Sequence, residues 1–133
     1  MSDSPESVVR KFLAAWADPK LDELVGFFSD DAVFIDGPRG VHSGAAAIKS
    51  ELEHELQMGF GGVTADVKSL VAEGETVMLE RVDSFNIGGK PFSMEIMAAF
   101  DINADGRIRR WRDSYDLKSV TDQIEAAGFN VPA

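Results

Sequence analysis

The chain has 133 residues, of which 44% are hydrophobic and 27% charged, as expected for one ordinary globular domain. Its formal net charge of −10 at pH 7 disfavours nucleic acid and anionic membrane as partners, because both are bound through Lys and Arg. The absence of cysteine excludes disulfides and thiolate metal sites. We therefore expect a single domain, residues 1–133, that binds a small, neutral or apolar molecule.

The sequence carries no signal for export. Its N-terminal segment is acidic and polar, without the basic start and apolar core of a secretory signal. No apolar run approaches the length that a bilayer-spanning helix needs. A chain without cysteine also suits a reducing compartment. We expect a cytoplasmic protein.

The first half of the sequence has mostly helical signals. Ser-Pro at 4–5 and Asp-Pro at 18–19 are typical helix starts, and apolar residues recur at helical spacing after each. A β-prone run follows and is stopped by Gly-Pro at 37–38. Ser-Gly at 43–44 can cap another helix. The prediction is a helix from residue 5 to about 16, a short helix ending near 29–31, a strand over 32–36 and a helix over 45–58.

The second half changes to the period of two that is typical of strands. Segments with this pattern alternate with Gly-containing turns that suit hairpins, and a final amphipathic helix follows. The segments are strands over 63–72, 76–87, 92–103 and 107–115, and a helix over 117–127. Helices followed by an antiparallel meander predict an α+β fold in which a curved sheet folds round the early helices.

The third predicted helix and its surroundings carry acidic and histidine residues. We interpret Glu51, Glu53 and Glu55 as one solvated helix face. His42 and His54 lie too far apart, and without local partners, to make a metal signature, so we place both on the surface and expect no metal site.

The stretch 77–87 places two charges on an otherwise apolar strand face. Alternate residues of a strand share a face, so Arg81 and Asp83 lie in line with Val77, Leu79, Phe85 and Ile87. Burying an ion is costly unless it is paired and hydrogen-bonded. This face therefore holds either an internal salt bridge or a functional site.

A third charge lies on the last predicted strand, where Trp111, Asp113 and Tyr115 share a face. If the strands of the meander pair in order, Asp113 approaches Arg81 and Asp83 across one pocket. Two carboxylates bridged by one guanidinium can have different pKa values and play different roles. Two separate structural ion pairs are the alternative.

These motifs resemble a known enzyme family. Glu80-Arg81-Val82-Asp83, followed about thirty residues later by Trp111-Arg112-Asp113-Ser114-Tyr115-Asp116-Leu117, resembles limonene-1,2-epoxide hydrolase and its relatives. The likeness extends over nearly the whole chain. That family belongs to the cone-shaped α+β superfamily of nuclear transport factor 2 (NTF2), ketosteroid isomerase and the SnoaL-like polyketide cyclases. The resemblance implies N-terminal helices packed in a strongly curved, mainly antiparallel sheet, a C-terminal helix, and usually a homodimer.

The resemblance also implies a reaction, the addition of water to a small apolar epoxide. Asp113 would be the general base that deprotonates a water, Asp83 the general acid that protonates the epoxide oxygen, and Arg81 the bridge that orients both. A strained epoxide needs a nucleophile on carbon and a proton on oxygen together, which opposed acid and base supply. No cofactor is required. The substrate-pocket residues that we expect are Phe34, Phe85, Met94, Ile96, Trp111 and Tyr115.

One part of the family pattern is missing. The family holds its water with a Tyr and an Asn two apart on the first strand, where this chain has Phe34 and Asp36. Phe34 cannot hydrogen-bond a water, and an ionised Asp36 only accepts. A third carboxylate near the other two should also raise a pKa. Asp36 is the candidate for a modified way of positioning the water.

Two other functions stay open. Asp36 occupies the place of the proton-shuttling Asp of ketosteroid isomerase, so isomerase-like or polyketide-cyclase-like chemistry is an alternative. Phe12, however, stands where that enzyme has a Tyr oxyanion donor, and residues 96–98 contain no second acid. The other alternative is a non-catalytic small-molecule binding domain, since a fold does not fix a function. A filled pocket, with Trp111 packed across Asp113, would favour it.

Overall fold

A computed structural model describes residues 3–130 of the chain. Within this range the helices and strands follow the predicted order, with one short strand added. The elements are α1 (Pro5–Ala15), α2 (Leu21–Gly26), β1 (Phe28–Asp36), the 3-10 turn η1 (Gly37–Arg39), β2 (Gly40–Ser43), α3 (Ala45–Gln57), β3 (Thr64–Glu73), β4 (Thr76–Ile87), β5 (Lys90–Ile102), β6 (Ile108–Ser114) and α4 (Leu117–Ala126).

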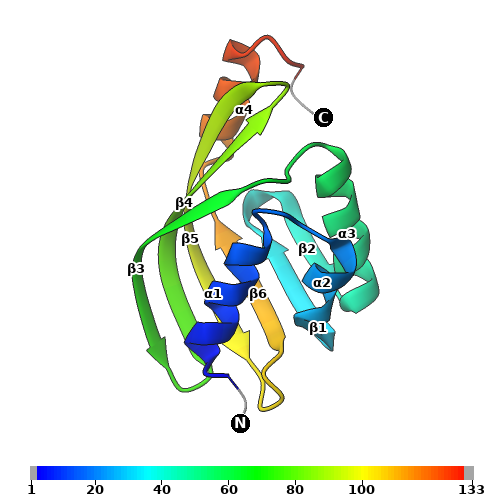
Figure 1. The fold of residues 1–133 in the computed structure, drawn as a ribbon, viewed down its shortest axis with the longest axis vertical. Coiled ribbons are helices and arrows are strands. Elements are labelled where there is room, and N and C mark those ends of the chain that lie inside the picture. The colour runs from blue at the N-terminus through cyan, green and yellow to red at the C-terminus, as the bar shows by residue number, and fades with distance from the viewer. Residues whose placement is uncertain (1–2, 131–133) are drawn as a thin grey trace.

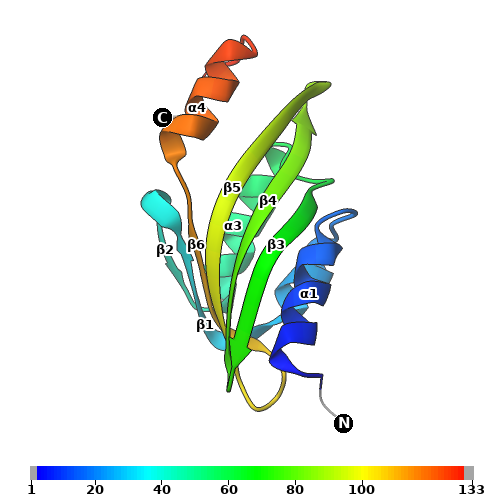
Figure 2. The same cartoon turned by 90° about the vertical axis from the view of Figure 1, so that its left-hand side faces the viewer.

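The strands form one six-stranded sheet in the order β2-β1-β6-β5-β4-β3. β3 to β6 pair antiparallel with their neighbours in the chain, which confirms the predicted meander. β1 pairs parallel to β6 and antiparallel to β2. The sheet is strongly bent, with α1 packed against β3, β4 and β5 and α3 packed against β1 and β2 (Figures 1 and 2). The α+β fold with helices inside a curved sheet is therefore confirmed.

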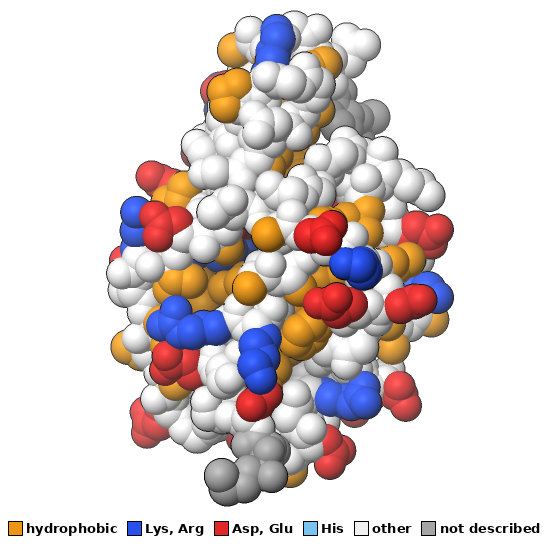
Figure 3. Space-filling view, viewed as in Figure 1, with side chains coloured by type: hydrophobic (Ala, Val, Ile, Leu, Met, Phe, Trp, Pro, Cys, Tyr) orange, Lys and Arg blue, Asp and Glu red, His pale blue; other side chains and the backbone are white. Residues whose placement is uncertain are grey.

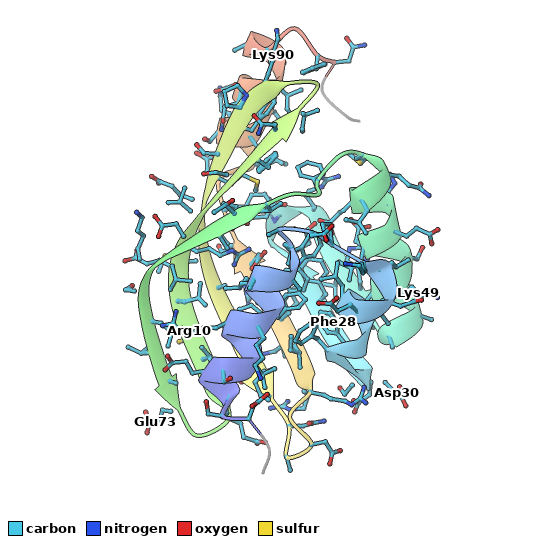
Figure 4. All side chains as sticks on the ribbon, viewed as in Figure 1. Arg10, Phe28, Asp30, Lys49, Glu73 and Lys90 are labelled. Carbon is cyan, nitrogen blue, oxygen red and sulfur yellow. The ribbon has the colours of Figure 1, made fainter. Side chains whose placement is uncertain are left out.

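The helix α1 supplies the central residues of the apolar core, inside the bend of the sheet. Ser4 caps its first turn by accepting a hydrogen bond from the backbone N–H of Ser7, and Pro5 occupies the first helical position, as predicted. Phe12 is fully buried, and its ring makes edge contacts with Phe28 at 5.4 Å and Trp111 at 5.0 Å between centroids. Phe28 lies in the interior, whereas Arg10 of α1 points outward (Figure 4). Phe12 is thus a packing residue of the core.

The helix α4 is tied to the sheet by polar contacts. Asp116 caps its start by accepting hydrogen bonds from the backbone N–H groups of Lys118 and Ser119. Further along, the Gln123 side chain exchanges two hydrogen bonds with the backbone of Ser93 on β5, at 2.8 and 3.0 Å. These contacts fix α4 beside the projecting ends of β4 and β5, an end of the molecule that shows few charged side chains in Figure 3. None of the helices in residues 3–130 is long and apolar enough to cross a membrane.

Three details of the predicted first half are wrong. β1 begins at Phe28, so residues 29–31 belong to a strand and do not end a helix. The helix α2 begins after Lys20, not at the predicted Asp18-Pro19 signal, and no side chain caps it, whereas Gly44 is the N-cap of α3 as predicted. β2 was not predicted, because four residues are too short for a pattern and its pairing with β1 depends on the tight corner at Gly37, where φ is +44°.

Candidate active site

Arg81 is the centre of a buried charge cluster. Its side chain is only 3% exposed, and its Nε donates a hydrogen bond to Asp83 Oδ1 at 2.9 Å. Its Nη1 and Nη2 donate to the two oxygens of Asp113, at 3.1 and 2.8 Å. One guanidinium therefore bridges both carboxylates, which rules out two separate ion pairs.

The strand register explains how these residues meet. Arg81 of β4 pairs with Ile96 of β5, and Asp113 of β6 pairs with Ala98, two residues further along β5. Ile96 and Ala98 share a face of their strand. The small side chain of Ala98 leaves room for the guanidinium to reach across β5 to Asp113. The three charges converge as the pairing of strands in order predicts.

The two carboxylates of the cluster have different surroundings. Burial raises the pKa of Asp83, and the neighbouring Arg81 offsets this only in part. Burial opposes the charge of Arg81, but the attraction of Asp113 and Asp83 outweighs it and holds the pKa above its usual value. Asp113 accepts a third hydrogen bond, from Trp111 Nε1 to its Oδ1 at 2.8 Å. The raised pKa of Asp83 favours the protonated form that a general acid needs.

A pocket with a cavity volume of about 100 Å³, enough for several waters, opens beside this cluster. All ten residues that the sequence analysis proposes for the site line it. They are Phe34, Asp36, Arg81, Asp83, Phe85, Met94, Ile96, Trp111, Asp113 and Tyr115. The other lining residues are Leu13, Trp16, Arg39, Glu55, Phe60, Val63, Ala65, Leu117 and Val120. The pocket is mainly apolar and is not filled by its own side chains.

Asp36 forms a second polar corner of the pocket. It lies beside Asp113 because β1 and β6 pair in parallel with these residues in register. Tyr115 donates a hydrogen bond from its hydroxyl to Asp36 Oδ1 at 2.9 Å. Its ring packs so close to Gly37 that a Cβ there would lie 2.9 Å from it. A glycine at this corner is thus what lets the Tyr115 hydroxyl reach Asp36.

The environment of Asp36 raises its pKa. Burial is the largest cause, Asp113 adds to it, and the hydrogen bond from Tyr115 acts in the opposite direction. A raised pKa is what the sequence predicts for a third carboxylate, although burial contributes more than the charge of the other acids. Phe34, in turn, stacks on Trp111 with 3.8 Å between ring centroids. Phe34 thus supports the Trp111 side chain that donates to Asp113.

Glu55 is a pocket residue that the sequence analysis missed. The prediction of a solvated face holds for Glu53, which is exposed, and is wrong for Glu55 and for Glu51, whose side chain is 17% exposed. The residue as a whole is partly exposed, but Glu55 Oε2 is buried and has no hydrogen-bond partner among residues 3–130. Burial, with Asp36 as the next cause, raises the pKa of Glu55 well above its usual value. Its spacing from the buried Ile48 and Leu52, seven and three residues, was the signal that it faces inward.

Some residues near this corner also have the chemistry of metal ligands. Asp36, His42 and Glu51 place one ligand atom each within 4.8 Å of one another. His42 is half-buried against the ring of Phe34, so its prediction as a surface residue is wrong, while His54 is exposed as predicted. His42 Nε2 lies 3.8 Å from Glu51 Oε2. This arrangement also suits a plain ion pair, so we assign no metal to it.

Comparison with known proteins shows which family the chain belongs to. A family model described as a SnoaL-like domain matches residues 9–111, most of the chain. The chain belongs to the SnoaL-like family. Its fold is that of the wider NTF2-like superfamily. A search of curated protein sequences found no match.

Several solved structures share the fold of this SnoaL-like protein. A hypothetical protein of Catenulispora acidiphila with a ketosteroid isomerase-like fold, solved with trimethylamine, is 24% identical with a TM-score of 0.79 (98% of this chain, 100% of the other). An LEH-like epoxide hydrolase of M. tuberculosis is 23% identical with a TM-score of 0.77, and the match covers 93% of this chain and 94% of the other. SalBIII is described as an epoxide hydrolase/cyclase-like enzyme in pyran ring formation in the polyether salinomycin. It is 16% identical with a TM-score of 0.74, and the match covers 86% of this chain and 92% of the other. At these identities the likeness establishes the fold alone.

Proposed function

We propose that this SnoaL-like protein is an epoxide hydrolase that adds water to a small apolar epoxide and releases a diol. The observation that carries the proposal is the Asp83–Arg81–Asp113 cluster in the wall of an apolar pocket. It places a candidate acid and a candidate base on either side of one fixed cation. The M. tuberculosis and salinomycin proteins, described as epoxide hydrolase-like and as epoxide hydrolase/cyclase-like, support the choice of reaction.

Asp113 is the proposed base, acting through one oxygen. Its Oδ1 accepts from both Arg81 and Trp111, whereas its Oδ2 accepts one hydrogen bond, from Arg81. Because a carboxylate oxygen accepts about two hydrogen bonds, Oδ2 has room for a water. Asp113 Oδ2 would take a proton from that water as its oxygen attacks an epoxide carbon.

Asp83 is the proposed acid. Its Oδ1 accepts from Arg81, and the structure gives its Oδ2 no partner among the described residues. A proton on Oδ2 would pass to the epoxide oxygen as the carbon–oxygen bond breaks, giving the second hydroxyl of the diol. Asp113 then holds the proton that Asp83 has lost, and its return through solvent restores the site. The step balances with water as the only co-substrate.

Asp36 is the proposed second holder of the water. It lies in register beside Asp113, and Tyr115 occupies only its Oδ1. Its Oδ2 is therefore left to accept a hydrogen bond from a water that also faces Asp113. This arrangement replaces the Tyr and Asn that the limonene-1,2-epoxide hydrolase pattern has on this strand.

Incubation with a panel of cyclic, aryl and linear epoxides is expected to give diols, detected by mass spectrometry. In water labelled with heavy oxygen, single-turnover reactions with excess enzyme should place the label in the diol and none in Asp83 or Asp113, because water attacks directly. A protein that converts no epoxide of the panel would exclude the proposed function. Label in an aspartate would exclude the one-step mechanism.

A second candidate reaction centres on Asp36, as in ketosteroid isomerase or a polyketide cyclase. It is favoured by the burial of Asp36, its raised pKa and the hydrogen bond from Tyr115, which together suit a base that moves a proton between carbons. Under this alternative, a Δ5-ketosteroid or polyketide substrate is converted, Asp36→Asn removes the activity, and Asp113→Asn spares it. Binding of apolar ligands without turnover of any of these substrates would instead indicate a binding domain.

We also propose that the protein is a homodimer. Three apolar side chains, Val71, Met78 and Met97, are 52–68% exposed on the outer face of β3, β4 and β5. Val71 pairs with Met78, and Met97 lies one row further on opposite Glu80, so the three are neighbours. Exposed apolar groups of this kind commonly mark an interface. Light scattering on the purified protein should give twice the mass of 14.4 kDa, and the monomer mass would contradict the proposal.

A further inference from the structure

The reaction proposed above does not use Glu55, although this residue faces the same pocket. Glu55 Oε2 is buried without a hydrogen-bond partner in the described part of the chain, and it is the sole side-chain atom there with this property. A buried polar group without a partner costs free energy, so a ligand atom that fills the position is favoured.

The charges around Glu55 decide which ligand group it can bind. Asp36, Glu51 and Asp113 are the neighbouring acids, and Arg39 is the neighbouring cation. Ionisation of Glu55 would add another negative charge to this group in a buried position. Burial and these neighbouring acids therefore favour the protonated form of Glu55, whose hydroxyl can donate a hydrogen bond.

Glu55 and the acid Asp83 lie on different sides of the pocket. Glu55 belongs to α3, which packs on β1 and β2, whereas Asp83 belongs to β4. Both residues line the same pocket. A group that binds to Glu55 is therefore a different atom of the substrate from the epoxide oxygen that receives its proton from Asp83.

We propose that the neutral carboxyl of Glu55 binds a second oxygen of the substrate, so that the enzyme takes epoxides that also carry a carbonyl, ester or hydroxyl group outside the epoxide ring. This inference rests on the proposed epoxide hydrolysis and names its substrate class. Asp83 and Asp113 act on the epoxide end, and Glu55 donates a hydrogen bond to the far end.

Two variants of equal side-chain length test whether Glu55 acts as a neutral hydrogen-bond donor. Glu55→Gln keeps a neutral donor, and Glu55→Met removes it. Glu53→Met, at an exposed position of the same helix, is the matched control. Circular dichroism establishes that each variant folds.

The readout is the ratio of kcat/KM for two substrates, a linear terminal epoxide and the same chain with a methyl ketone at its far end. Wild type, Glu53→Met and Glu55→Gln should prefer the keto-epoxide, whereas Glu55→Met should lose about tenfold of that preference, mainly through KM. An unchanged preference in Glu55→Met would overturn the proposal. Equal losses in Glu55→Gln and Glu55→Met would also overturn it, because a neutral donor at this position would then not be what binds the ketone.

Binding of the saturated methyl ketone, followed by fluorescence of the pocket residues Trp16 and Trp111, tests Glu55 without any turnover. Affinity should fall as pH rises through the pKa of Glu55, because the ionised carboxyl no longer donates, and should fall less in Glu55→Gln. If no epoxide reacts but the ketone binds in this way, epoxide hydrolysis fails and the role of Glu55 stands. Ketone binding that is equal in wild type and Glu55→Met excludes the role of Glu55 even if epoxides react.

Discussion

Asp113→Asn is expected to lower kcat for epoxide hydrolysis by about 10²–10⁴-fold, the usual contribution of a general base. The amide keeps the size of the side chain and an oxygen that can accept from Trp111, but it cannot take a proton from water. Arg81 retains Asp83 as an ionic partner, so the buried guanidinium is not left alone. Steady-state kinetics with the best epoxide of the panel measure the loss.

Asp101→Asn is the matched control for Asp113→Asn. Asp101 is 8% exposed on β5 and accepts hydrogen bonds from Thr76 at 2.7 Å and Arg110 at 2.6 Å, away from the pocket. Its substitution should lower the free energy of unfolding and leave kcat of the folded protein unchanged. If Asp113→Asn keeps kcat within a few-fold of wild type, Asp113 is not the base.

Arg81→Met is expected to have the largest effect on stability. It leaves Asp83 and Asp113 buried without their shared cation, and removing one partner of a buried ion pair costs about 3–5 kcal/mol of unfolding free energy. The loss should also depend on pH. Without Arg81, the pKa of Asp83 rises further in the folded state and stays at its ordinary value in the unfolded state.

A folded-state pKa above the unfolded one means that the folded protein binds more protons, so the stability of Arg81→Met should fall as pH rises from the ordinary Asp pKa of about 4 towards neutral pH. Urea unfolding at both ends of this range measures it. Arg110→Met is the control, because Arg110 is 33% exposed and pairs with Asp101, and its loss should cost about 1 kcal/mol or less. A loss in Arg81→Met no larger than in Arg110→Met would show that the cluster does not depend on its cation.

Phe34 and Asp36, which replace the Tyr and Asn of the family pattern, both have contacts that link them to Asp113. Phe34 stacks on Trp111, whose Nε1 donates to Asp113, so the aromatic residue acts on the proposed base through its neighbour. Asp36 is held by Tyr115 and lies next to Asp113. Under the proposed function, Asp36 would then hold the water in place of the Tyr and Asn of the family pattern.

The sequence by itself determined the α+β class, the meander of four strands and the inward direction of Arg81 and Asp83. These are local properties, because the alternation of a strand and the start of a helix depend on residues within a few positions of each other. The convergence of Arg81, Asp83 and Asp113 needed one further assumption, that neighbouring strands pair in order, and β4, β5 and β6 do so.

Only the tertiary structure decided the other side of the pocket. The parallel pairing of β1 with β6 sets Asp36 beside Asp113, and the packing of α3 against β1 and β2 turns Glu55 inward. These contacts join residues far apart in the chain, and their formation depends on the burial of whole elements against one another. A local pattern of charges does not contain that information, which is why Glu55 looked like a solvated residue in the sequence and has a buried carboxyl oxygen in the fold.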